Sequence, residues 1–140
     1  MKKIVLATTL ALFSLSSNAA WRTAPNGSVG TQFHTNNGDR AIFQVAQTSQ
    51  GHIVSVGIFT KQPCKPESNV KLESVTWLDH SIPTYIGCRE TGVGKAVFLF
   101  PKVPSDNEEI YARLVSNAQQ HTPLRLNDGV VSTEGFLSLK

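Results

Sequence analysis

The chain has 140 residues, a formal net charge of +3 and 16% charged residues. This length fits one domain with a single hydrophobic core. Its lysines and arginines are scattered beyond the first residues, so they form no basic patch of the kind that binds nucleic acid or lipid headgroups. We therefore expect neither a nucleic-acid partner nor a membrane-surface partner.

The N-terminus predicts a cleaved secretory signal of bacterial type. A positive start, Met1–Lys3, precedes an apolar run over residues 4–15, and the small residues Ser17 and Ala19 then occupy the positions that a signal peptidase reads. An apolar run of about 12 residues is too short for a bilayer span of about 20. We expect cleavage after Ala19, a periplasmic or secreted protein, and a single β-rich domain over residues 20–140 that does not insert into a membrane.

Both cysteines, Cys64 and Cys88, belong to this expected mature part. Two thiols in an oxidising compartment usually pair, which predicts a Cys64–Cys88 disulfide. An intermolecular bridge and two free thiols remain as alternatives. The spacing is far from C-x-x-C, so a structural disulfide is favoured over a redox-active pair.

The mature chain predicts six or seven short strands. The clearest is a β-hairpin, in which Ala41–Thr48 and His52–Thr60 alternate around the link Ser49–Gly51. Other strands are expected at residues 29–35, 70–78, 84–89 and 95–100, with two or three closing strands within 124–139. Loops are expected at residues 36–39, 61–69, 79–83 and around Gly92 and Gly94, where turn-forming residues gather.

One late helix interrupts this pattern. Ser105 and Glu108 match the S-x-x-E capping box, and apolar residues then recur at helical spacing, which predicts a helix from about Asp106 to about Asn117. Pro123 prevents its extension. The fold class is therefore mainly β with one amphipathic helix, arranged as a small barrel or sandwich.

No segment predicts a catalytic or cofactor site. Thr91–Ala96 resembles a phosphate-binding loop, but Arg89 stands where that loop needs its first glycine, and Ala96 stands where it needs Ser or Thr. Asn26 likewise replaces the first glycine of a G-x-S-x-G motif around Ser28. We expect no catalytic residue, no cofactor and no enzymatic activity.

The four histidines are isolated in the sequence, so no metal site is predicted; they are His34, His52, His80 and His121. Asp79 and His80 could form a fragment of a catalytic relay, but they lie in a predicted turn where Asp is favoured for structural reasons.

Aromatic rings are the side chains that could stack on a sugar. The candidates are Trp21, Trp77, Tyr85 and Tyr111. A core position accounts for most of them, since Trp77 alternates with core candidates and Tyr111 lies on the apolar stripe of the helix. Trp21 alone has no obvious core assignment, although it could cap the end of a barrel.

Four segments carry a resemblance to a known family. They are Ala20-Trp21, Thr31–Thr35, the strand residue Phe43, and Ile110–Leu126. These segments resemble the pentameric B subunits of subtilase- and pertussis-like AB5 toxins. The resemblance implies an OB-like barrel, a glycan ligand and a homo-oligomer.

The chain departs from that family at three positions. Gln44 and Val56 stand near the places of the family's cysteines, and Asn26 stands where the family presents a sugar-contacting serine. The candidate ligand-binding residues are accordingly Trp21, Asn26 and Ser28. The favoured interpretation is an exported, non-enzymatic binding module for a glycan. The alternatives are a periplasmic inhibitor or immunity protein that contacts another protein, and a small hydrolase with an unrecognised site.

Overall fold

The computed structural model describes residues 21–60, 70–91 and 94–139. The expected signal peptide and its cleavage site after Ala19 lie outside the described residues, as do the 61–69 loop, Cys64 and Gly92. Cys88 lies in a strand, but because its expected partner is not described, the Cys64–Cys88 disulfide stays a prediction.

The described chain forms nine strands, one α-helix and one 3₁₀ helix. The strands of the large sheet are β1 (Arg22–Thr23), β2 (Val29–His34), β3 (Arg40–Thr48), β4 (Gly51–Thr60), β5 (Lys71–Thr76), β6 (Ser81–Thr91) and β7 (Gly94–Pro101). The helix α2 (Pro104–Gln119), the hairpin strands β8 (Leu124–Leu126) and β9 (Gly129–Val131), and the 3₁₀ helix η1 (Phe136–Ser138) follow.

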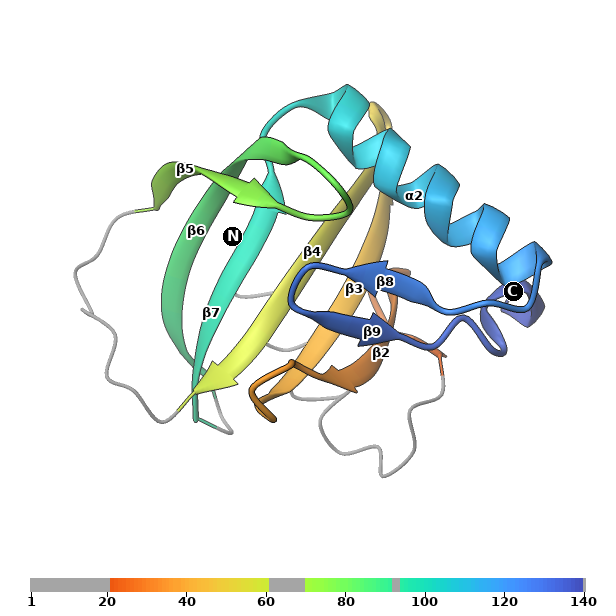
Figure 1. Cartoon of the computed structure of the whole chain (residues 1–140), viewed down its shortest axis with the longest axis horizontal. Coiled ribbons are helices and arrows are strands. Elements are labelled where there is room, and N and C mark those ends of the chain that lie inside the picture. Colours follow the sequence, from red (N-terminus) through yellow and green to blue (C-terminus); the bar gives the residue numbers. More distant parts are fainter. Residues whose placement is uncertain (1–20, 61–69, 92–93, 140) are drawn as a thin grey trace.

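The large sheet is antiparallel, with the strand order β1-β2-β3-β4-β7-β6-β5. It is strongly curved, and α2 and the β8–β9 hairpin lie across its concave side (Figure 1). The mainly β fold with one late helix is thus confirmed. Of the two arrangements expected, a small barrel or a sandwich, the structure does not form a closed barrel, because β1 and β5 end the sheet as edges, and α2 with the β8–β9 hairpin covers its concave side.

The predicted hairpin is confirmed. Its strands pair from Ala41 opposite Ile58 to Thr48 opposite Gly51. Only Ser49 and Gln50 lie between the paired ends, and Gly51 has a φ of +118°, a conformation that L side chains rarely adopt. The turn is therefore tighter than the predicted three-residue link, and its glycine belongs to β4.

The main core lies between the concave face of the sheet and the elements that cover it. It includes Phe43 and Val54 from the sheet, Leu114 from α2 and Leu124 from β8, each fully buried. A smaller cluster occupies the opposite face of the sheet, which we call the outer face, and contains Ile42 and Phe98. Because successive strand residues point to opposite faces, Ile42 and Phe43 enter different clusters.

The helix begins earlier than the sequence predicted, and its predicted capping box is wrong. Val103 is the N-cap, without a side-chain cap, and Pro104 starts the helix. Proline suits this first position because its fixed φ is helical and its missing N–H would have no intrahelical partner there. Ser105 consequently lies inside the first turn, and Glu108 points to β4 instead of to the N-cap.

The remaining boundaries differ modestly from prediction. β6 begins at Ser81, so Pro83 lies within a strand and not in the predicted 79–83 turn. Of the two or three closing strands expected within residues 124–139, the structure forms two, β8 and β9, and the 3₁₀ helix η1 follows them. Within the described residues, no helix has both the length and the apolar character to cross a membrane.

Candidate functional site

Trp21, a predicted ligand residue, lies in the main core with 6% of its surface exposed. Its indole N–H donates to the carbonyl of Ser132 at 2.7 Å, and its ring meets Phe43 and Phe136 edge-on at 6.1 and 4.8 Å. The ring therefore presents no open face on which a sugar could stack. Trp21 anchors the N-terminal end of the fold to its C-terminal end.

Asn26 and Ser28, the other two predicted ligand residues, form a local turn. The Asn26 side-chain oxygen accepts hydrogen bonds from the backbone N–H of Ser28 at 3.1 Å and from its hydroxyl at 2.7 Å. Gly27 between them has a φ of +88°, as this turn requires. Asn26 is exposed but Ser28 is buried, so the hydroxyl that a ligand would need is occupied inside the turn.

The aromatic candidates separate by burial. Trp77 is buried, and its indole N–H donates to the Thr84 hydroxyl at 3.0 Å. Tyr111 is partly buried on α2, stacked on the ring of His52. Tyr85 is partly buried like Tyr111, but it lies on the outer face of β6, whereas Tyr111 packs against the main core.

Tyr85 forms the centre of a surface that we call the aromatic patch, made of Leu72, Tyr85 and Phe100. Tyr85 is the cross-strand neighbour of Leu72 on β5 and of Phe100 on β7. The rings of Tyr85 and Phe100 are 5.5 Å apart and tilted by 46°, and 49% of Leu72 is exposed. The sequence marks Tyr85 as an aromatic candidate but does not reveal the patch, because its three residues come from three different strands.

A second cluster fastens α2 to β4. β7 pairs with β4 only from Val56 to Thr60, so the first half of β4 has no strand on that side. Side chains of α2 replace the missing strand: Asn107 accepts the N–H of Val54 at 2.9 Å, and Glu108 accepts the N–H of His52 at 2.6 Å. Asn107 is buried and also donates to the carbonyl of Pro101 at 3.3 Å.

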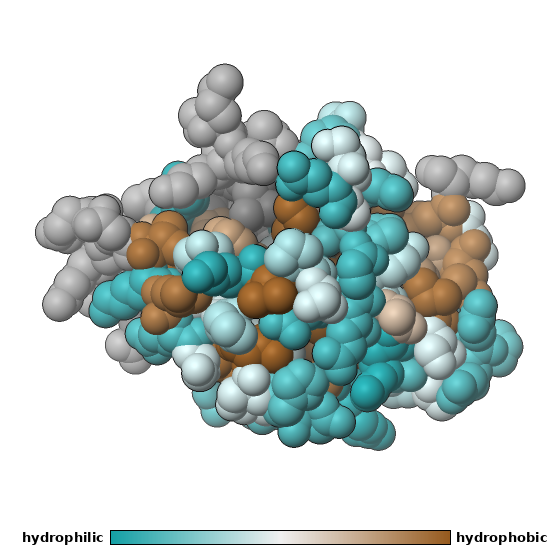
Figure 2. All heavy atoms as spheres, turned by 90° about the horizontal axis from the view of Figure 1, so that it is seen from above, coloured by the Kyte–Doolittle hydropathy of each residue, from teal (hydrophilic) through white to brown (hydrophobic). Residues whose placement is uncertain are grey.

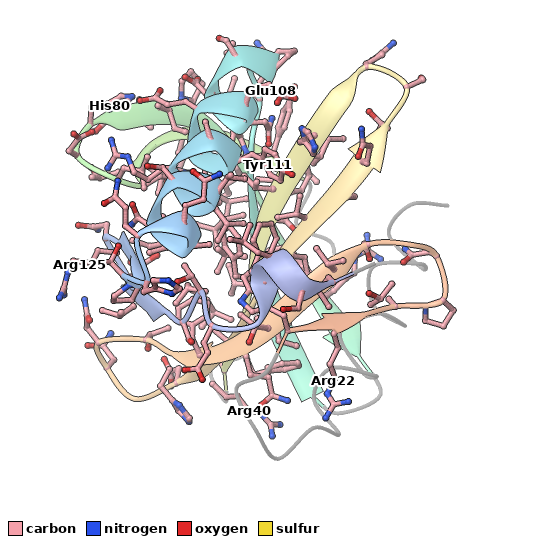
Figure 3. The ribbon with its side chains drawn as sticks, turned by 90° about the vertical axis from the view of Figure 1, so that its right-hand side faces the viewer. Arg22, Arg40, His80, Glu108, Tyr111 and Arg125 are labelled. Atoms are coloured by element: carbon pink, nitrogen blue, oxygen red, sulfur yellow. The ribbon has the colours of Figure 1, made fainter. Side chains whose placement is uncertain are left out.

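Glu108, His52 and Tyr111 form one side of this cluster. The second Glu108 oxygen lies 2.9 Å from Nδ1 of His52, and the His52 ring stacks on Tyr111 at 3.6 Å. Glu108 and Tyr111 both extend from α2 toward the β3–β4 hairpin (Figure 3). The hydrogen bond from the His52 backbone, followed by the bond from its ring, lowers the pKa of Glu108. The predicted role of Glu108 at the helix N-terminus is thus replaced by a contact between elements.

A third group lies on the other side of α2, around His80 (Figure 3). Nδ1 of His80 donates to Asp79 at 2.8 Å, and this hydrogen bond lowers the pKa of Asp79 and raises that of His80. Nε2 of His80 is 3.6 Å from Glu109, and Asp106 completes a set whose ligand atoms lie within 4.8 Å of one another. These residues could hold a cation, but exposed carboxylates gather in this way without one.

Two histidine–carboxylate pairs are described, His52 with Glu108 and His80 with Asp79. No hydrogen bond described in the structure joins His52 or His80 to a serine, threonine or cysteine side chain. Nucleophilic catalysis needs such a hydroxyl or thiol within reach of the base. The His52–Glu108 pair links β4 to α2, and the Asp79–His80 pair lies between β5 and β6.

Comparison with known protein families, with curated proteins and with solved structures finds no match to this chain. The resemblance to toxin B subunits accordingly stays a prediction.

Proposed function

We propose that this chain is an exported, non-enzymatic binding module that binds a glycan through the aromatic patch. The observation that carries the proposal is the partly exposed Tyr85–Phe100 pair on the outer face of the sheet, beside the exposed Leu72. A tyrosine ring offers an apolar face to the C–H groups of a sugar and a hydroxyl to its polar edge.

The shape of the molecule favours a ligand bound on the surface. The cavity lined by Val56, Trp77 and Leu126 has a volume of about 10 Å³, which is room for about one water molecule. This cavity is too small for a sugar, whereas the aromatic patch is partly open to a ligand. The patch stands on three adjacent paired strands, so its rings are held by the sheet before a ligand arrives. Such preorganisation reduces the entropic cost of binding.

A glycan array probed with the purified exported protein tests the proposal. We expect binding to a restricted set of glycans. The Tyr85→Ala variant should lose at least about tenfold in affinity, corresponding to 1.4 kcal/mol, whereas Tyr85→Phe should retain the stacking contribution. Leu137→Ala is the matched control, because Leu137 is 54% exposed but lies in η1, away from the patch strands. Binding that Tyr85→Ala leaves unchanged, or no glycan binding at all, would contradict the proposal.

The second candidate function is that of an inhibitor or immunity protein that contacts another protein. Exposed apolar side chains at the C-terminal end favour it: Val130 on β9 is 44% exposed, and Leu137 on η1 is 54% exposed. Apolar side chains reach the surface toward both ends of the molecule in the view from above, toward β5 and toward the C-terminal segment (Figure 2). A pull-down from periplasmic extract should then yield one stoichiometric partner that the Val130→Glu and Leu137→Glu variants release. Recovery of the same partner by both variants would exclude this surface.

A further inference from the structure

The edge strand β5 is unusually open. Residues Val70 to Ser74 are all exposed, although side chains of a strand point alternately to both faces of the sheet. Val70 is 37% exposed and Leu72 is 49% exposed. An exposed edge strand with apolar side chains has free backbone N–H and C=O groups that can pair with another strand.

The charges along β5 are self-complementary. Lys71 and Glu73 are two residues apart, so they lie on the same face of the strand, and neither forms an ion pair with another described residue. In an antiparallel pair of two β5 strands related by a twofold axis through Leu72, Lys71 of each copy stands opposite Glu73 of the other. Leu72 then meets Leu72, and Val70 meets Ser74. Opposite charges placed directly across two strands attract, and identical ones would repel.

From these observations we infer that β5 is the contact surface for a second copy of this chain, which pairs with it antiparallel about Leu72. The two sheets then join into one continuous sheet with twofold symmetry, in which each copy uses the same surface. Lysine on an edge strand often prevents such pairing. Here the glutamate two residues further along turns that lysine into half of an attractive pair.

The neighbouring elements confine the contact to the first part of β5. The carbonyl of Trp77, just after β5, accepts the N–H of Asn127 at 2.7 Å, so the turn of the β8–β9 hairpin occupies the space beside the end of the strand. The five residues Val70 to Ser74 remain free of that turn. This inference goes beyond the proposed glycan binding and does not depend on it. Leu72 belongs to both surfaces, but the charged pair Lys71 and Glu73 points to the face opposite Tyr85.

Charge exchange tests the inference. Sedimentation equilibrium of the purified exported protein should show a reversible monomer–dimer equilibrium. Lys71→Glu places two glutamates opposite two glutamates, and Glu73→Lys places two lysines opposite two lysines. Each single variant should weaken dimerisation at least about tenfold, whereas the double variant Lys71→Glu/Glu73→Lys restores both attractive pairs and should recover the wild-type constant within about threefold.

Three outcomes would overturn the inference: a wild-type protein that is monomeric up to its solubility limit, single variants that dimerise like the wild type, or a double variant no better than the single ones. Because both residues are exposed, all variants should unfold at the wild-type temperature when monomeric, and thermal unfolding checks that a loss of dimer is not a loss of fold. The glycan array with Tyr85→Ala remains a separate test, so failure of the dimer and failure of the proposed function are distinguishable.

Discussion

Glu108 binds His52 twice: one carboxylate oxygen accepts the His52 backbone N–H at 2.6 Å, and the other lies 2.9 Å from Nδ1 of its ring. The two residues are 56 positions apart in the sequence. Together with Asn107, Glu108 satisfies backbone donors of β4 that β7 does not reach. A helix thus completes the edge of a strand through its side chains.

The Gly51→Ala substitution should disturb the contact between Glu108 and His52 and so destabilise the protein. A Cβ at position 51 would lie 2.5 Å from a carboxylate oxygen of Glu108, and the alanine backbone would also have to adopt a φ of +118°. Gly38→Ala is the matched control, since Gly38 has a φ of +89° but nothing within 4 Å of its added Cβ. Each substitution should cost about 1 kcal/mol for its backbone conformation, and Gly51→Ala should cost clearly more. Urea unfolding measures both, and equal losses would mean that Glu108 does not hold the turn of the β3–β4 hairpin.

Glu108→Gln should destabilise the protein in a pH-dependent way. The His52 hydrogen bonds lower the pKa of Glu108 below its ordinary value of 4.5, so its charged form stabilises the fold. A carboxyl whose pKa is lower when folded contributes stability above its unfolded pKa, and the contribution is lost as the pH falls through the folded pKa. The difference in melting temperature between wild type and Glu108→Gln should therefore be largest near neutral pH and vanish well below pH 4.5.

Thermal unfolding over that pH range measures the effect. Glu134→Gln is the control, because it removes the same charge from an exposed side chain that makes no hydrogen bond described in the structure. A difference for Glu108→Gln that is constant with pH would contradict the assigned contact.

Asn107→Ala should be among the costlier substitutions on α2. It leaves the Val54 N–H without its acceptor in a buried position, and unsatisfied buried donors cost about 1–3 kcal/mol. Ser105→Ala, two residues earlier, should change the unfolding free energy by less than about 0.5 kcal/mol, because Ser105 is exposed and does not cap the helix. Urea unfolding measures the free energy of both variants. A larger loss of stability for Ser105→Ala than for Asn107→Ala would mean that Ser105 caps the helix after all.

Trp21→Ala should destabilise the protein by about 3–5 kcal/mol, as expected for a large buried aromatic residue. Loss of the bond to Ser132 and of the contacts with Phe43 and Phe136 is the cause. Trp21→Phe keeps an aromatic ring in the core and should retain part of that stability. A Trp21→Ala protein that unfolds like the wild type but binds no glycan would return Trp21 to the ligand site.

Local patterns predicted those parts of the fold that neighbouring residues determine. Alternation and a turn located the β3–β4 hairpin, and helical spacing located most of α2. The pairing of β4 with β7 joins segments about forty residues apart, and no periodicity specifies it. For this reason the sequence could not choose between a barrel and a sandwich, since strand number alone does not determine whether the two edges of a sheet meet.

The candidate site shows the same limit. Trp21 stood near the expected new N-terminus and had no periodic neighbours, so its burial against Phe136 was invisible in the sequence. Glu108 had a complete local explanation in the S-x-x-E pattern, and that explanation concealed its contact with His52. Tyr85 was named among the aromatic candidates, but its partners Leu72 and Phe100 come from two other strands.

The most direct test of the proposed binding surface is residue-resolved. Backbone amide shifts of the isotope-labelled protein, recorded by NMR while a glycan selected on the array is added, report where the ligand lies. We predict that the largest changes fall on β5, β6 and β7 around Leu72, Tyr85 and Phe100, and that they saturate with the affinity measured on the array. Shift changes centred instead on the Asn26–Ser28 turn or on His52 and Tyr111, with the shifts of the aromatic-patch residues unchanged, would contradict the account.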